Sequence, residues 1–437
     1  MMKVYKFETI KDEDEINKII CCIEKNHPFL VIVPAFTQLQ QWTQNLSVSW
    51  FHDEDETSHN IIKCISDYCF NIASRFISNS TIYKEMHECI CICINKLHQL
   101  VENRADVLID KIIKAEICKL SASLMAGCFC ERGIRSQILD TSEFMQINLE
   151  RRPDLPYIQE NIRKYLNQNR DIDLFIAPLS LCKNVYGEID FMSNQRNDYY
   201  ATILSAAFHA EEITLSTNFV NIFTNQNRMR ENHYLTYQEA ENLVNTGIHL
   251  IYADCITLAS RSKITIRLTD TYDLDTERIF ISNQDTGNSV KAILTQDSIT
   301  FVRFTSLNIL PGYLFMGKLL DIISKYKINI ISMVSSNVSI SMLVHTSTDT
   351  LRIVQRELYK YAKMVVEENM SAIHIIGSLH WEQTRIESCI MDTIGNIPVS
   401  MISYGGDDNC FTISVRTEDK KQLINSLSKQ FLDLQPM

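Results

Sequence analysis

Short apolar runs alternate with amphipathic stretches along the first two thirds of the chain, and this order predicts a layered α/β domain. The runs FLVIVP (29–34) and DLFIA (173–177) are apolar almost throughout, which is typical of strands buried on both faces of a parallel sheet. Further strands are expected at 4–7, 134–139, 213–215, 222–223 and 264–268. Apolar positions three and four residues apart predict helices at 12–24, over most of 57–130, and at 198–208, 237–245 and 255–259.

The pattern changes after the polar segment SNQDTGNS (282–289), which predicts a linker. From there strand, helix, strand, strand and helix follow one another twice, which predicts two modules that duplicate a fold. The expected strands lie at 299–304, 328–334, 338–344, 372–376, 399–403 and 410–415, and the expected helices at 315–325, 350–361, 384–394 and 420–431. We therefore predict one domain over 1–285 and a tandem region over 286–437, with modules at 290–365 and 366–437. An arrangement in which the last segment returns to the first module stays open.

Composition and charge narrow the classes of function. The 437 residues suffice for two or three domains, and the hydrophobic fraction of 45% supports real cores. The net charge of −11 comes without a basic stripe, so we expect no nucleic-acid partner. Apolar runs are shorter than the ~20 residues that span a bilayer, and the N-terminus lacks the apolar stretch of a signal peptide. We therefore expect no membrane association and a cytoplasmic location.

Fourteen cysteines raise the question of a metal site. Cys89, Cys91 and Cys93 alternate with isoleucine, and Cys128 and Cys130 are equally close, but no C-x-x-C spacing occurs. Zinc sites usually present that spacing, so we expect no metal and interpret the cysteines as buried thiols. Reduced thiols fit a reducing cytoplasm.

Glycine is scarce, at 11 of 437 residues against about 7% in ordinary proteins. A backbone wraps closely around phosphate groups only where a Cβ is absent or φ can be positive. The chain therefore has few glycines from which phosphate-binding loops could be built.

Three segments of the C-terminal third resemble the tandem ACT modules of the aspartate kinases, and they look closest to the lysine-inhibited type. They are FTSLNIL (304–310), INIISMVSSNVSISMLV (328–344) and IPVSMISYGGDDNCFTISV (397–415), in the family's order and spacing. Four earlier segments resemble the family's kinase body: KVYKF (3–7), KLSASLMAGCFCERGIRSQILDTSEF (119–144), NDYYATILSAAFHAEEITLSTN (197–218) and NTGIHLIYADCITLASRSKITIRL (245–268). The resemblance covers nearly the whole chain.

The resemblance implies an amino-acid kinase domain, which is a three-layer α/β/α sandwich, followed by two ferredoxin-like ACT modules of βαββαβ topology. It implies transfer of the ATP γ-phosphoryl group to the aspartate side chain, with Mg-ATP as the cofactor if the chain is active. It also implies a homodimer through the ACT modules and an amino-acid effector.

The family's opening lysine is kept as Lys6, a candidate catalytic residue. The Gly-Gly-Thr-Ser that follows in the family reads Glu8, Thr9, Ile10 and Lys11 here. Glu8 places a carboxylate where the family faces polyphosphate, and like charges repel strongly where water is scarce. The alternative for Lys6 is a surface charge that closes a strand.

The substrate motif is altered as well. Ser121 is kept as a candidate substrate-binding residue, but the Gly-Glu before it falls on Ile117 and Cys118. A shift of register by two residues places Glu116 at that position instead.

The candidate nucleotide-binding residues are Asp198, Thr217 and Arg228, each the remnant of a longer motif. Asp198 also reads as the N-cap of its helix, which is the interpretation we favour, and Arg228 as a solvated loop residue. His249 stands at the position of a family lysine near the phosphates. Neutral histidine is a poor substitute for a fixed cation, and a packed side chain is the alternative.

The candidate effector-binding residues lie within the second resembling segment of the C-terminal third (328–344): Ser335, Ser336, Asn337, Val338 and Ser339. The acidic position that holds lysine in the family is Ile331 here, which argues against lysine as the effector. The alternative is that the modules are kept for dimerisation alone.

The altered motifs predict an aspartate kinase homologue that is inactive or weak and has a regulatory or assembly role, with an active enzyme as one candidate partner. The alternative is an active kinase for aspartate or another carboxylate, with a rewired site that uses Glu8, Lys11, Arg196 and His249. A third hypothesis is a purely structural scaffold.

Overall fold

The computed structural model describes residues 2–431 apart from 53, 104–107, 151, 170, 193–196, 218–231, 246–250, 271–277, 285–289, 308–310, 380–383 and 407–408. The chain divides into two compact units. The first comprises Met1–Asn218 and Asp254–Phe280, and the second comprises Phe219–Ala253 and Ile281–Met437. Each unit is described separately below, starting from the sheet that organises it.

The first unit is built on the consecutive strands β3-β4-β2-β1-β7-β9-β10 of an eight-stranded, largely parallel sheet. Its strands are β1 (Lys3–Lys6), β2 (Leu30–Val33), β3 (Ser136–Ile138), β4 (Leu174–Pro178), β7 (Glu212–Thr217), β9 (Thr265–Asp270) and β10 (Arg278–Ser282). All four residues of β2 are buried, as the FLVIVP run predicts. Adjacent strands from β3 to β9 pair in parallel, so their carboxyl ends gather at one edge of the sheet.

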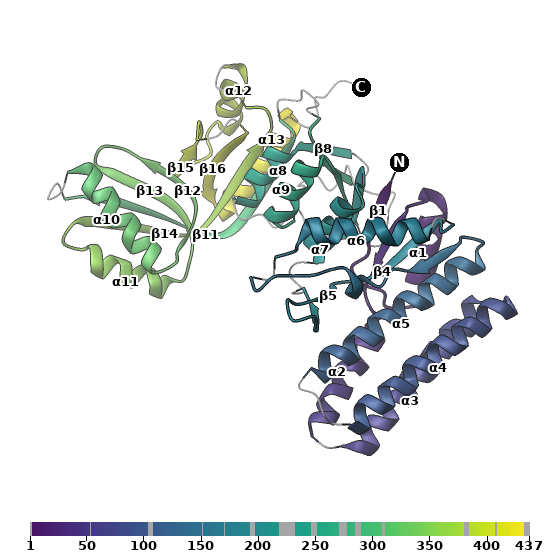
Figure 1. Ribbon diagram of the computed structural model, residues 1–437. Helices are drawn as coiled ribbons and strands as arrows, with labels where there is room; N and C mark the ends of the chain where they lie inside the picture. The colour runs from purple at the N-terminus through teal and green to yellow at the C-terminus, as the bar shows by residue number, and fades with distance from the viewer. Residues whose placement is uncertain are drawn as a thin grey trace. The chain divides into compact units, whose positions relative to one another are not determined.

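Helices cover both faces of this sheet (Figure 1). They are α1 (Glu13–Asn26), α2 (Thr37–Phe51), α3 (Asp55–Phe76), α4 (Ser80–Asn103), α5 (Ile109–Glu131), α6 (Leu155–Gln168), α7 (Asn197–Ala207) and α9 (Ala253–Ser262). One core joins Tyr5 and Val31 of the sheet to helices α1 to α5. On the opposite face Phe175 packs edge-on against Tyr165 of α6. The arrangement is the expected three-layer sandwich.

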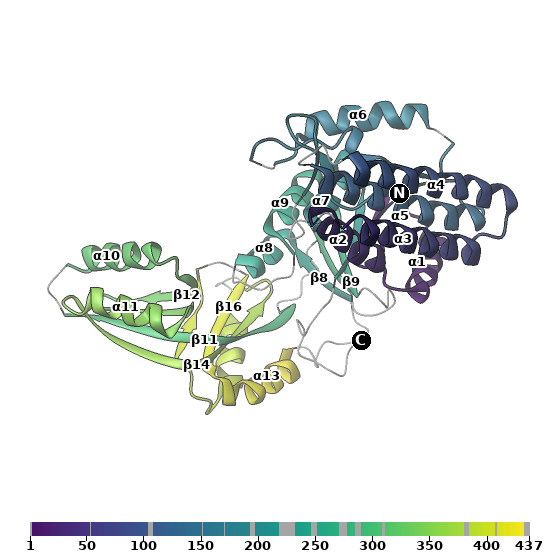
Figure 2. The same cartoon turned by 90° about the horizontal axis from the view of Figure 1, so that it is seen from below.

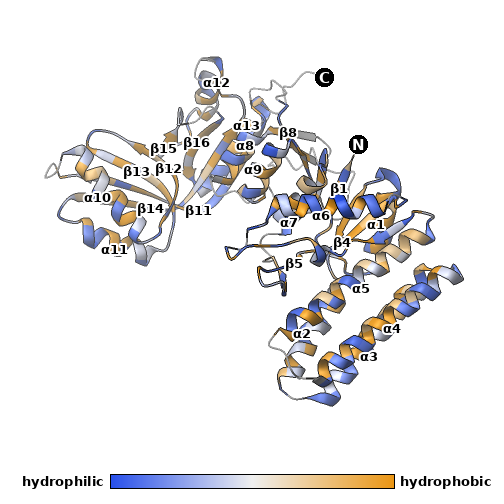
Figure 3. Ribbon diagram, viewed as in Figure 1, coloured by the Kyte–Doolittle hydropathy of each residue, from blue (hydrophilic) through white to orange (hydrophobic). Residues whose placement is uncertain are grey.

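The long helices α3, α4 and α5 lie side by side, as Figures 1 and 2 both show. Apolar and polar residues alternate along α3 and α4, which is the pattern of helices that bury one face (Figure 3). A short hairpin of β5 (Leu181–Lys183) and β6 (Ile189–Phe191) precedes α7, and a single 3₁₀ turn, η1 (Thr141–Glu143), follows β3.

Most predicted elements of the first unit are confirmed, but α2, α6, β10 and the β5–β6 hairpin were not predicted. The reason is clearest for α2, whose buried positions are Leu39, Thr43, Leu46 and Ser49. Their spacing is helical, yet two of the four are polar, so no apolar stripe marks the helix. The strand expected at 222–223 lies outside the described residues.

The second unit contains an antiparallel sheet with the order β12-β13-β11-β14-β16-β15. Its elements are β11 (Ala292–Ser306), α10 (Gly312–Lys325), β12 (Asn329–Ser335), β13 (Ser339–His345), α11 (Thr348–Leu358), β14 (Ala362–Ile376), α12 (Thr384–Ile394), β15 (Met401–Ser403), β16 (Cys410–Arg416) and α13 (Thr417–Phe431). Segments β8 (Asn232–Thr236) and α8 (Tyr237–Asn245) also belong to this unit.

Two long strands, β11 and β14, are shared by both modules of this sheet. They pair along their whole length, with register shifts near Gln296 and Ile299. One core gathers around Phe304 beneath α10 and α11, and a second around Ile373 beneath α12 and α13. Ile293, from the start of β11, lies in the second core. The start of β11 therefore contributes to the core of the second module, and its later part to the core of the first.

A buried ion pair holds α8 within the second unit. The Lys291 ammonium lies 3.0 Å and 3.1 Å from the two carboxylate oxygens of Glu239, and these side chains are 4% and 2% exposed. Glu239 also accepts a hydrogen bond from the Thr236 amide, while its own amide donates to the Thr236 hydroxyl. This reciprocal capping box explains why the predicted helix begins at Tyr237.

We predict that Lys291→Met lowers the free energy of unfolding of the second unit by about 3–5 kcal/mol, because it leaves a buried carboxylate without its cation. Urea denaturation of the full chain measures this loss. The matched control is Lys325→Met, which removes an exposed partner of Glu357 and is expected to have little effect. Equal effects of the two substitutions contradict the importance of the buried pair.

A second prediction concerns His374 in β14, which is fully buried and lies 3.0 Å (Nδ1) from the Thr412 hydroxyl. Burial lowers its pKa to about 4. The unfolded chain, with an ordinary histidine, binds the proton more tightly, so stability falls as the pH drops below about 6.5. We expect His374 to account for a loss of about 2 kcal/mol between pH 7.5 and pH 5. Denaturation at both pH values should show this loss shrinking in His374→Leu, and an unchanged pH dependence contradicts the prediction.

Candidate functional site

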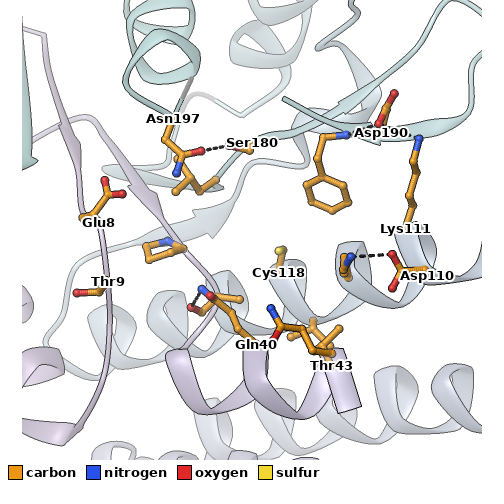
Figure 4. A pocket seen from close by; sticks show the side chains of 17 residues that line it. Glu8, Thr9, Gln40, Thr43, Asp110, Lys111, Cys118, Ser180, Asp190 and Asn197 are labelled. Atoms are coloured by element: carbon orange, nitrogen blue, oxygen red, sulfur yellow. Dashed lines mark hydrogen bonds and ion pairs between the residues drawn. The ribbon is translucent and has the colours of Figure 1, made fainter. Parts of the chain in front are cut away.

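The carboxyl ends of β1, β2 and β4 surround a cavity of about 580 Å³ in the first unit (Figure 4). Ligands of open α/β sheets bind at this edge, so the cavity is the natural candidate site. Its wall is formed by the loops after the three strands, by α2 and α5, and by the β5–β6 hairpin. The polar side chains on it are Glu8, Thr9, Gln40, Thr43, Gln44, Asp110, Lys111, Lys114, Ser180, Asp190 and Asn197.

Helix α5 presents one face to the cavity. Lys111, Lys114 and Cys118 recur at helical spacing and all line it. The Lys111 ammonium lies 2.9 Å from an Asp190 oxygen, and the Lys114 ammonium 2.6 Å from an Asp110 oxygen. Both cations on this wall are therefore already matched by carboxylates of the same unit.

Lys6 ends β1 beside this cavity and is only 2% exposed. Its ammonium contacts the Glu8 carboxylate and donates a hydrogen bond to an Asp198 oxygen at 2.9 Å. One buried cation thus lies between two carboxylates, and the alternative of a surface charge is wrong. We call this group, Lys6, Glu8 and Asp198, the lysine clamp.

The helix-cap interpretation of Asp198 is not what the structure shows. Asp198 is the second residue of α7, and its carboxylate accepts the Lys6 hydrogen bond. The Glu8 amide donates to the Ser216 hydroxyl at 3.0 Å, which ties the end of β1 to the end of β7. The clamp therefore links the end of β1 to α7, and the Glu8 amide adds a link to β7.

The turn between β4 and β5 holds the opposite wall. Ser180 has a positive φ of 65°, and its hydroxyl donates to the Asn197 side-chain oxygen at 2.6 Å. The buried Tyr200 hydroxyl lies 3.1 Å from the carbonyl oxygens of both Pro178 and Leu181. Burial raises the pKa of Tyr200, so it stays protonated and fixes this turn to α7.

Ser121 is fully buried on α5 and is engaged by backbone groups. Its hydroxyl donates to the Ile117 carbonyl at 2.9 Å and accepts from the Phe36 amide at 3.4 Å. Glu116 lies on another face of α5 and binds Lys96 of α4 at 2.7 Å. Cys118, on which the resemblance places the family's glutamate position, lines the cavity.

The candidate effector residues form the exposed turn between β12 and β13. The Ser336 hydroxyl accepts hydrogen bonds from the amides of Val338 and Ser339 at 3.4 Å and 3.1 Å, which closes the turn. Ser335 is exposed at the end of β12, and Asn337 is exposed at the tip. Ile331, at the family's acidic position, is buried in the sheet.

Three predicted site residues cannot be placed. Arg228 and His249 lie outside the described residues, as does the side chain of Thr217 at the end of β7. Among the residues that are described, no cluster of three or more His, Cys, Asp or Glu side chains could hold a metal ion. No described helix is long and apolar enough to cross a membrane.

The sequence analysis missed Lys111, Lys114, Asp110 and Asp190 as cavity residues. A usable signal existed for the lysines, because they recur on α5 with the spacing of one helical face. No comparable signal marks Asp190, which reaches the cavity through a hairpin that the sequence did not predict.

Comparison with known proteins finds similarity in both sequence and fold. Residues 60–270 match the model of the amino acid kinase family. Lysine-sensitive aspartokinase 3 of Escherichia coli is 20% identical over 72% of this chain and 73% of its own length. The bifunctional aspartokinase/homoserine dehydrogenase of Buchnera aphidicola is 21% identical over 88% of this chain, which spans about half (54%) of that longer protein.

The crystal structure of the aspartate kinase of Clostridium acetobutylicum superimposes with a TM-score of 0.78 at 17% identity, covering 99% of both chains. At this identity the likeness shows the fold. It confirms the predicted α/β kinase fold followed by a C-terminal antiparallel sheet like that of the family's regulatory domains.

We predict that Cys118 is chemically inert although it lines the cavity. Burial raises the pKa of its thiol to about 12, against a smaller opposing effect of the Lys114 ammonium. Thiolate is the reactive form, so at pH 7.5 alkylation should be at least about a hundredfold slower than at an ordinary cysteine. Peptide mass spectrometry after iodoacetamide treatment measures this, with the exposed Cys21 and Cys64 as internal references. Labelling of Cys118 at the reference rate contradicts the raised pKa of its thiol.

Proposed function

Since the chain is a homologue of the aspartate kinases with an amino-acid kinase domain, we propose that it has lost efficient phosphoryl transfer and acts as a regulatory or assembly protein. The single observation that carries this proposal is the lysine clamp. Phosphoryl transfer depends on cations that face the transferring group, and here the family's opening lysine, Lys6, is buried between two carboxylates.

The net charge of the lysine clamp disfavours the binding of a polyphosphate. Lys6 supplies one positive charge and its two partners supply two negative ones, so the clamp is anionic overall. At an effective dielectric constant near 20, a phosphate charge about 4 Å from the Glu8 carboxylate is repelled by roughly 4 kcal/mol. A Lys6 ammonium without its two carboxylate partners would instead attract the phosphate.

The backbone at this edge supports the same conclusion. The segments that follow β1, β2 and β4 read FETIKD, PAF and LS, without a single glycine. In the described part of the first unit, the glycines with positive φ are Gly133 after α5 and Gly187 in the β5–β6 hairpin. Neither lies after a strand of the parallel sheet, where a phosphate-cradling turn would be needed.

The role we infer is therefore one of assembly, through a homodimer of the C-terminal modules. An amino-acid effector bound at the turn 335–339 would supply regulation, and the buried Ile331 argues against lysine as that effector. The second candidate function, a carboxylate kinase with a rewired site, is favoured only by Lys111 and Lys114 on the cavity wall. Both would have to leave their carboxylate partners to serve it.

An aspartate hydroxamate assay with Mg-ATP tests the proposal on the purified full chain. Ordinary enzymes turn over at about 1–10³ per second, and each lost contact to the transition state costs about 10²–10³ in rate. We expect turnover below about 0.01 per second. A rate near 1 per second that disappears in Lys6→Ala would refute the loss of catalysis.

Removing the Glu8 charge should restore part of the affinity for nucleotide. We predict that Glu8→Gly and the isosteric Glu8→Gln both lower the dissociation constant for Mg-ADP by about tenfold or more, because Lys6 is then freed from one anion. Isothermal titration calorimetry measures the change. The control Glu188→Gln alters an exposed carboxylate of the β5–β6 hairpin and should change nothing. If folded Glu8→Gln binds no better than the unaltered chain, the clamp is not what excludes nucleotide.

A further inference from the structure

The helical hairpin of α3 and α4 carries one histidine on each helix at matching positions. His59 lies near the start of α3 and His98 near the end of α4, so the two are almost equally far from the short connection 77–79. The helices pack side by side (Figures 1 and 2), which brings these two positions together. The centres of the two imidazole rings are 5.1 Å apart.

The ring of His59 is held in one tautomer. Its Nδ1 lies 2.8 Å from the carbonyl oxygen of Asp55, one turn earlier on α3. A carbonyl oxygen only accepts hydrogen bonds, so Nδ1 carries the proton and donates it. In the neutral imidazole, Nε2 then has a free lone pair. Histidines that bind metal ions are usually oriented in this way, with the second ring nitrogen donating to a carbonyl or carboxylate.

The separation of the two rings suits a shared metal ion. Zinc–nitrogen bonds are about 2.0–2.1 Å long, so two imidazoles bound to one tetrahedral ion have ring centres about 5 Å apart. The rings of His59 and His98 have this separation before any ion is bound. Each ring comes from a different packed helix, so little rearrangement is needed for both to bind the same ion.

The surroundings of the pair favour a metal ion over protons. Partial burial of His98 and the neighbouring His59 ring lower the pKa of the His98 imidazole, although the Glu102 carboxylate opposes this effect. The His98 ring is therefore neutral near neutral pH, which is the form that binds metal ions. Asp55 and Glu102, each one turn from a histidine of the pair, add negative charge that attracts a cation.

We propose that His59 and His98 together bind one divalent transition-metal ion of the class that prefers imidazole, such as zinc, and that this ion ties α3 to α4. Two nitrogen ligands do not suit Mg²⁺ or Ca²⁺, which prefer oxygen. Water completes the coordination, so the site needs only two side chains, fewer than the clusters of three sought among the described residues. The expectation of no metal rested on cysteine spacing, which does not test a site built from imidazoles.

Isothermal titration calorimetry of the full chain with Zn²⁺ tests the site. Iodoacetamide first blocks the exposed thiols of Cys21 and Cys64, which would otherwise compete for zinc. We expect one ion per chain. His59→Gln and His98→Gln should each raise the dissociation constant at least about tenfold, because losing even a hydrogen-bond partner of a ligand costs about 10–100-fold in metal affinity. The control His345→Gln removes an exposed histidine of β13 and should change nothing.

Two results of this titration would overturn the proposal. If the unaltered chain binds no Zn²⁺ at millimolar concentration, the two rings only stack against each other. If the folded variants bind Zn²⁺ as tightly as the unaltered chain, the ion is held elsewhere. Neither result bears on phosphoryl transfer, because the cavity of the first unit is lined by other elements, and the hydroxamate assay tests that activity separately.

Two further measurements show whether both rings bind the ion and whether the ion joins the helices. The electron paramagnetic resonance spectrum of bound Cu²⁺ should show splitting from two nitrogen nuclei in the unaltered chain, and from fewer in His59→Gln or His98→Gln. Ni²⁺ should raise the midpoint of thermal unfolding of the unaltered chain, because an ion that binds only the folded form stabilises it. This rise should be absent from both variants. An unchanged nitrogen splitting, or a rise that persists in both variants, contradicts the shared site.

Discussion

A buried ammonium group stays charged only where negative groups compensate its lost hydration. The Lys6 side chain is such a group, and it lies at the centre of the first unit. Desolvating one such ion costs several kcal/mol even after relaxation. Lys6 ends β1, which lies between β2 and β7, so its charge cannot move to solvent without disturbing the sheet. Glu8 and Asp198 supply the compensation from β1's own loop and from the first turn of α7. The lysine clamp thus stabilises this edge of the sheet, and it also cancels the positive electrostatic potential that Lys6 would otherwise create there.

The second unit is constrained by the number of its strands. Two ferredoxin-like modules need four strands each, but the sheet has only six. The long strands β11 and β14 solve this by serving both modules, and the register shifts along β11 mark the passage from one to the other. The two cores are therefore joined directly by continuous strands and not by a flexible linker. The Glu239–Lys291 ion pair then holds α8 near the start of β11, because Lys291 is the residue just before that strand.

Local patterns in the sequence were sufficient for most strands of both sheets, because runs such as 29–34 and 173–177 have no exposed face to weaken the apolar signal. Strand β10 (Arg278–Ser282) was not predicted. They were insufficient where burial is mixed. Helix α2 buries Thr43 and Ser49 beside two leucines, and the first half of β14 exposes residues 366–369 before its buried second half. The site was harder still. The residue types at positions 6, 8 and 198 were informative, but only the tertiary fold shows that the three charges meet, since 190 residues separate Glu8 from Asp198.

Each unit balances the charges that it takes away from water. In the first unit the cations beside the cavity are matched by carboxylates: Lys6 by the clamp, Lys111 by Asp190 and Lys114 by Asp110. A wall of matched pairs leaves little net positive charge to attract a phosphate group. In the second unit the buried Lys291 ammonium is matched by the Glu239 carboxylate in the same way. Because an unmatched buried ion costs several kcal/mol, the fold itself fixes these pairs, and a ligand that needs one of the cations must first displace its carboxylate partner.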